Sequence, residues 1–115
     1  MKTTIPELQS YLTSLLPSIS SSSYETFVNL FVPLDCTPSD ISHFLKDLQS
    51  DTAQWTNLTS EIIAIEAGTN VTNIEETQNK VVFYFTHPIL DKCDREVEFV
   101  RMESEAGEML WRAGG

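Results

Sequence analysis

The last third of the sequence has the pattern of an antiparallel meander, and this feature constrains the fold most. Residues 81–86 form an apolar run, residues 95–102 alternate in character, and residues 103–107 form a turn that leads into residues 109–112. Everything before about Trp55 has helical periodicity. Because helices and strands are segregated along the chain, we expect an α+β fold with helices on one face of a curved sheet.

Length and charge limit the classes of protein to which the chain can belong. It has 115 residues and is 41% hydrophobic, which predicts a single domain over residues 1–115. Seventeen acidic and seven basic residues give a net charge of -10, so nucleic acid and anionic membranes are not expected partners. No signal-peptide core and no apolar segment of about 20 residues is present, so we expect a cytoplasmic protein.

Two helices are expected near the amino terminus. Leucines at three- and four-residue spacing predict a helix that begins near Pro6 and that Pro17 ends or kinks. A serine-rich connector follows. Ser22 and Glu25 have the spacing of a capping box for a second helix, which Pro33 would stop.

A third helix and two further strands are expected in the middle of the chain. Thr37 and Pro38 are typical of a helix start, and the buried face of this helix would extend to Trp55. The apolar core of residues 58–66 predicts a strand buried on both sides, and a short strand follows at residues 71–74. The sequence therefore predicts three helices packed on a mainly antiparallel sheet.

This order of elements, with the segment 27–35 and the closing run 103–110, resembles the nuclear transport factor 2-like superfamily. That superfamily includes SnoaL-like cyclases, ketosteroid-isomerase-like enzymes and scytalone-dehydratase-like proteins. The resemblance covers residues 6–114 and is one of pattern rather than of an invariant motif. It implies a cystatin-like cone, in which a curved sheet wraps the helices around a conical pocket. Members also include non-catalytic binders, so the fold alone does not imply an enzyme.

Two polar residues at strand ends are candidates for catalysis. His87 follows the apolar run before Pro88, and an imidazole with a pKa near 6.5 suits proton transfer at neutral pH. The alternative is a loop histidine that is hydrogen-bonded to the backbone. Arg101 stands on the apolar row of Val97 and Phe99, where it needs an anionic partner or a polar cavity. Arg101 would bind an enolate or carboxylate in the pocket. The alternatives are a structural salt bridge or an exposed arginine at the end of the strand.

Asp35 and Tyr84 complete the catalytic candidates. The resemblance implies an acid facing the pocket near Asp35, whose pKa would rise if Phe31 and Leu34 desolvate it. The alternative is a loop or capping acid. Tyr84 would polarise a carbonyl, or else belong to the core.

Aromatic side chains are the expected lining of the pocket, although aromatic residues at these spacings are more often core. The candidates for substrate binding are Tyr24, Phe31, Trp55, Phe83, Phe85, Phe99 and Trp111. The glutamates of the last third are expected on a solvated face, and no metal site is expected. Cys36 and Cys93 lack metal or redox spacing and are expected to be idle thiols, with a disulfide or a reactive role left open.

Two hypotheses for function follow. The first is a cofactor-independent SnoaL-like isomerase, cyclase or dehydratase acting on a small hydrophobic molecule, such as a polyketide or terpenoid intermediate. Asp35 or His87 would move a proton, while Tyr84 or Arg101 would stabilise the oxyanion. The alternative is a non-catalytic ligand-binding or protein-interaction domain whose cone is filled by side chains. On either hypothesis we expect a homodimer through the sheet face.

Overall fold

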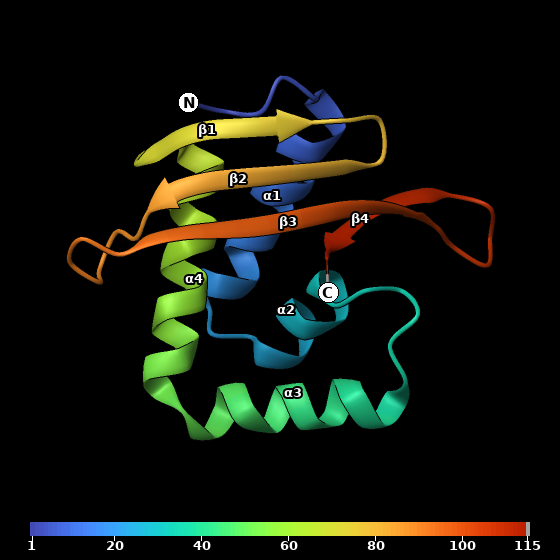
Figure 1. Ribbon diagram of the computed structural model, residues 1–115. Coiled ribbons are helices and arrows are strands. Elements are labelled where there is room, and N and C mark those ends of the chain that lie inside the picture. Colours follow the sequence, from blue (N-terminus) through green and yellow to red (C-terminus); the bar gives the residue numbers. More distant parts are fainter. Residues whose placement is uncertain (115) are drawn as a thin grey trace.

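The computed structural model describes residues 1–114, which form four helices followed by four strands (Figure 1). The helices are α1 (Pro6–Ser20), α2 (Tyr24–Phe31), α3 (Pro38–Ser50) and α4 (Thr52–Ala67), and the strands are β1 (Val71–Glu76), β2 (Lys80–Thr86), β3 (Asp94–Glu103) and β4 (Met109–Ala113). The sheet order is β1-β2-β3-β4, with every neighbouring pair antiparallel. The predicted α+β class and the predicted meander are confirmed.

The prediction of three helices is wrong, because the expected buried strand at residues 58–66 is part of α4. Ile62 and Ile65 are fully buried, whereas Ile63 is 48% exposed, so burial follows a helical period and only one face is covered. Asp51 caps the helix, since its carboxylate accepts a backbone N–H of the first turn. Trp55 therefore belongs to α4 and not to the third helix.

The boundaries of the other helices agree with the sequence in part. Thr37 caps α3 as expected, accepting the N–H of Asp40. Pro17 was predicted to end or kink the first helix; it does not end it, because α1 continues through Pro17 to Ser20. A proline this near the carboxyl end removes little of the helical hydrogen bonding. The predicted capping box is also wrong: Ser23 is the N-cap of α2 and its side chain makes no capping bond. Within residues 1–114, no helix is both long and apolar enough to cross a bilayer.

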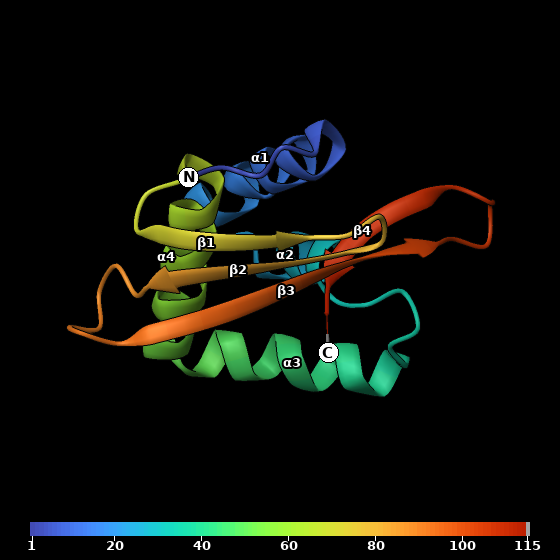
Figure 2. The same cartoon turned by 45° about the horizontal axis from the view of Figure 1, so that its top comes forward.

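The core lies between the sheet and the helices that cover one of its faces. Figures 1 and 2 show α1, α2 and α4 behind the sheet, while α3 runs along its lower edge. Alternate residues of β2 face the helices, and the rings of Phe83 and Phe99 meet edge to face at 5.9 Å. Tyr11 of α1 packs edge to face on Phe99 from the other side, at 6.0 Å. Each of the buried phenylalanines contributes roughly 1.5–3 kcal/mol of burial free energy.

The shortness of β4 leaves part of the sheet edge uncovered. β4 pairs with residues 99–103 of β3, and one further bond joins the N–H of Gly114 to the carbonyl of Glu98. Residues 94–97 of β3 therefore pair with β2 on one side and have no strand on the other within the described chain. The space between this part of β3 and α3 opens to solvent.

Candidate functional site

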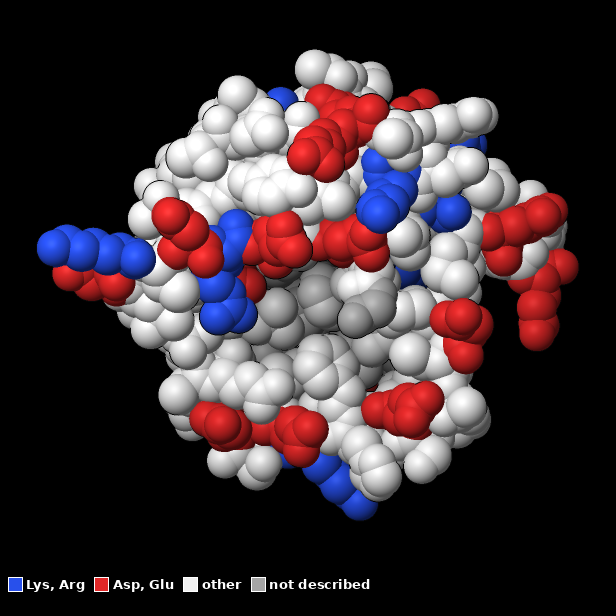
Figure 3. All heavy atoms as spheres, viewed as in Figure 1, with Lys and Arg blue, Asp and Glu red and all other residues white. Residues whose placement is uncertain are grey.

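A groove of about 490 Å³ occupies the space between the open edge of β3 and helices α3 and α4. Figure 3 shows a recess in the surface between β3 and α3, below a line of acidic side chains over the sheet. The apolar wall of the groove comes from Phe31 of α2, Phe44 of α3 and Leu58 of α4. The groove is therefore shaped by three helices and one strand.

Polar side chains enter the groove from α4 and β3. Gln54, Asn57 and Glu61 line it at three- and four-residue spacing, which places them on one face of α4. Arg95 lines it from β3. An apolar wall with a few polar groups is the usual form of a small-molecule site.

Glu61 is the most unusual of these polar residues, because only 7% of its surface is exposed. Its Oε1 atom lies 3.3 Å from Nε2 of His87 and 3.9 Å from Nε of Arg95. Burial raises the pKa of the Glu61 carboxyl above its ordinary value, while the charges of Arg95 and then His87 partly offset the rise. A carboxyl group whose pKa has been raised in this way is suited to general acid–base catalysis.

His87 lies behind Glu61 and is itself shielded from solvent. Its Nδ1 atom accepts the backbone N–H groups of Ile89 at 3.1 Å and Leu90 at 3.0 Å. Because Nδ1 is an acceptor, the neutral imidazole carries its proton on Nε2, the atom that faces Glu61. Nε2 has no partner with hydrogen-bond geometry within residues 1–114, so its contact with Glu61 is electrostatic at the present distance.

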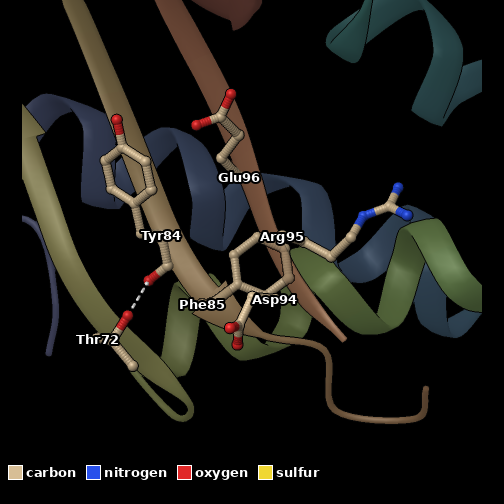
Figure 4. Close-up of a pocket in the computed structure, with 6 residues that line it drawn as sticks. All are labelled: Thr72, Tyr84, Phe85, Asp94, Arg95 and Glu96. Atoms are coloured by element: carbon tan, nitrogen blue, oxygen red, sulfur yellow. Dashed lines mark hydrogen bonds between the residues drawn. The ribbon is translucent and has the colours of Figure 1, made fainter. Parts of the chain in front are cut away.

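Arg95 reaches the same carboxylate from the solvent side. Its side chain is 52% exposed, and its ion-pair contact with Glu61 uses Nε. Figure 4 shows that Arg95 extends away from Tyr84 and Glu96, which project from the other face of the sheet. The guanidinium group therefore borders the groove with its terminal nitrogens available to an anionic or carbonyl oxygen.

The four predicted catalytic residues lie in four different places. His87 is beside the groove but shielded by Glu61, and its hydrogen bonds are those of the alternative interpretation, a histidine bound to the loop backbone. Asp35 is exposed in the loop after α2, so Phe31 and Leu34 do not desolvate it. Arg101 lies six residues beyond Arg95 along β3, roughly 20 Å away at the usual rise of a strand, and forms no ion pair within residues 1–114.

Tyr84 lies on the outer face of the sheet, opposite Glu96 in the register of β2 and β3. Partial burial, followed by the carboxylates of Glu75 and Glu96, raises the pKa of its hydroxyl. In Figure 4 the Tyr84 carbonyl accepts the hydroxyl of Thr72, at 3.2 Å. The structure does not bring Tyr84 together with Asp35, His87 or Arg101.

The seven aromatic residues expected to bind substrate lie mainly in the core. Tyr24 packs against Trp55 with ring centroids 4.5 Å apart, and Phe31 meets Phe99 edge to face at 6.3 Å. Phe31 lines the groove. The remaining five of the seven are all buried in the hydrophobic core: Trp55, Phe83, Phe85, Phe99 and Trp111.

Sequence reasoning missed Glu61 and Arg95. Glu61 was hidden because residues 58–66 were assigned to a strand, whereas helical spacing would have placed it on one face with Gln54 and Asn57. Arg95 belongs to the same helix-facing row of β3 as Val97 and Phe99, which the alternation does indicate. Cys36 and Cys93 are half-buried free thiols, so the possible disulfide is absent from the structure.

No protein-family model matches this chain, and no curated protein or solved structure matches it.

Proposed function

We propose that the chain is a cofactor-independent acid–base enzyme, an isomerase, cyclase or dehydratase, that acts on a small hydrophobic oxygenated molecule in the groove. The observation that carries this proposal is the nearly buried carboxyl of Glu61, whose pKa is raised, in a groove with an apolar wall. This reaction class is the one implied by the resemblance to the SnoaL-like proteins. Glu61, rather than Asp35 or His87, would transfer the proton.

The geometry supports a two-step transfer of a proton. Glu61 would remove a proton from the carbon next to a carbonyl, and the electron pair of the broken C–H bond would pass to the carbonyl oxygen as an enolate. The guanidinium of Arg95 would stabilise that oxyanion. Glu61 would then return the proton, either to the far carbon of a conjugated dienolate or to a hydroxyl group that leaves as water while its C–O bond breaks and the enolate electrons form a C=C bond. His87 would act as a positioning residue, since it holds the carboxylate from behind.

A proton-exchange assay tests the proposal. Small cyclic ketones are incubated with the protein in deuterated water, and exchange at the carbon next to the carbonyl is followed by NMR. We expect exchange above the buffer rate with the wild type and its loss in Glu61→Gln, which keeps the size of the side chain. Glu66→Gln is the matched control, because Glu66 lies on the same helix and does not line the groove.

The result that contradicts the proposal is equal exchange by the Glu61→Gln and wild-type proteins. Absence of exchange in the wild type with every ketone tried would also count against an enzyme of this class.

The packing of the aromatic residues favours one alternative function. Because Trp55, Phe83 and Phe99 fill the space between sheet and helices, we propose as the alternative a non-catalytic ligand-binding or protein-interaction domain with a filled cone. The homodimer through the sheet face belongs to this alternative as well. That face presents Glu75, Tyr84, Glu96 and Glu98, so two copies would bring like charges together.

A further inference from the structure

A second groove, of about 310 Å³, adjoins the first one and differs from it in character. It is bordered by Val32 and Pro33 after α2 and by Ala113 at the end of β4. Phe31 and Phe44 line both grooves, and their rings lie nearly parallel with centroids 6.4 Å apart. The two grooves are therefore neighbours that share this pair of rings in their linings.

The two grooves have complementary chemistry. The first groove carries the polar side chains of Glu61, Arg95 and Asn57, none of which lines the second. The second is bordered mainly by aliphatic and aromatic groups, with Asp40 and the thiol of Cys36 as its polar members.

Partial burial, followed by the charges of Asp40 and Asp35, raises the pKa of the Cys36 thiol, so this sulfur is uncharged at neutral pH. An uncharged thiol is compatible with an aliphatic neighbour.

We infer that the ligand is an elongated amphiphile, with an oxygen-acceptor head group at Arg95 and Glu61 and a linear aliphatic tail that crosses Phe31 and Phe44 into the second groove. This inference rests on the proposed function, because the head group is the part on which Glu61 would act. A ligand confined to the first groove would leave the apolar surface of the second in water. A tail that covers it gains the free energy of burying that surface.

The length of the ligand's alkyl chain is the variable that tests the inference. Methyl ketones of increasing length, below their aggregation concentrations, are titrated against the wild-type protein by calorimetry. Each methylene that enters the second groove is expected to tighten the dissociation constant by about fourfold. The increase should stop when the groove is full.

Two substitutions fill the second groove from two different segments of the chain. Ala113→Leu acts from β4 and Cys36→Leu from the loop after α2. Both are expected to abolish the dependence on chain length and to leave the affinity for the shortest ketone unchanged. Arg95→Gln should instead weaken all ketones by the same factor. Melting temperatures and amide NMR spectra report whether each variant remains folded. If one of the two filled variants does not fold, the other still tests the inference.

The outcomes separate the inference from the proposed function. If short ketones bind and exchange through Glu61, but longer ones bind no tighter to the wild type, the second groove is not a tail site and the inference is overturned. The inference also fails if the gain with length persists in both filled variants. Loss of exchange with all ketones bears on the proposed function, whereas the dependence of binding on chain length is measured without turnover.

Discussion

His87 has two roles in the structure that can be separated by substitution. Its Nδ1 atom accepts the N–H groups of Ile89 and Leu90, and its Nε2 atom faces Glu61. In asparagine the terminal oxygen stands at the δ position, so His87→Asn keeps the acceptor for the loop and removes the contact with Glu61. In glutamine the amide nitrogen stands at the ε position, so His87→Gln keeps the contact and removes the acceptor.

The sizes of the two effects follow from these contacts. His87→Gln loses two hydrogen bonds of about 1 kcal/mol each, a total of about 2 kcal/mol. His87→Asn keeps them and loses about 1 kcal/mol because the smaller side chain leaves space in a buried site. For 115 residues the entropy of unfolding is roughly 0.24 kcal/mol/K. The melting temperature should therefore fall by about 8 °C in His87→Gln and by about 4 °C in His87→Asn.

Thermal denaturation and amide hydrogen exchange test this reasoning together. The amides of Ile89 and Leu90 should stay protected in His87→Asn and exchange quickly in His87→Gln. Ketone proton exchange should be faster in His87→Gln than in His87→Asn, because only His87→Gln keeps a donor beside Glu61. Equal melting temperatures and equal protection of the two amides in both variants would refute the assignment of Nδ1 as the acceptor.

Two further predictions concern charge. The pKa of Glu61 is raised above 4.5 in the folded protein, so its ionisation costs stability as pH rises through that raised value, and the cost is absent below the unfolded pKa. Glu61→Gln should therefore melt higher than the wild type at pH 7, with a difference that disappears near pH 4; a difference independent of pH contradicts this. A homodimer through the sheet face would be opposed by Glu75, Glu96 and Glu98, so sedimentation velocity should show more dimer at high salt than at low salt. A monomer at every salt concentration excludes that interface.

The strands and one helix cap could be predicted from the sequence because their signals are local. Alternation along β3, the apolar run of β2 and the turn before β4 each depend on residues that are close in the chain. Thr37 before a proline is a capping signal of the same kind. These local signals do not depend on which helices and strands pack against one another.

The end of α4 and the site could not be predicted in the same way. Consecutive isoleucines favour a strand locally, and only the covering sheet decides that Ile62 is buried while Ile63 is exposed. If this segment is a strand, Glu61 is not expected to lie near His87 or Arg95. The contact among these three joins a helix, a strand end and a neighbouring strand, and no spacing in the sequence encodes it.

The meander has a consequence for how the chain folds. Each strand pairs with the one before it, so every sheet contact closes a short loop, a topology associated with rapid folding. However, α1, α2 and α4 all precede the strands that lie over them. During synthesis the core that includes Leu8, Leu12 and Ile62 lacks its strand residues until β2 and β3 have been made. The helical half is therefore exposed to aggregation during translation, and the core closes only when the last third of the chain has been made.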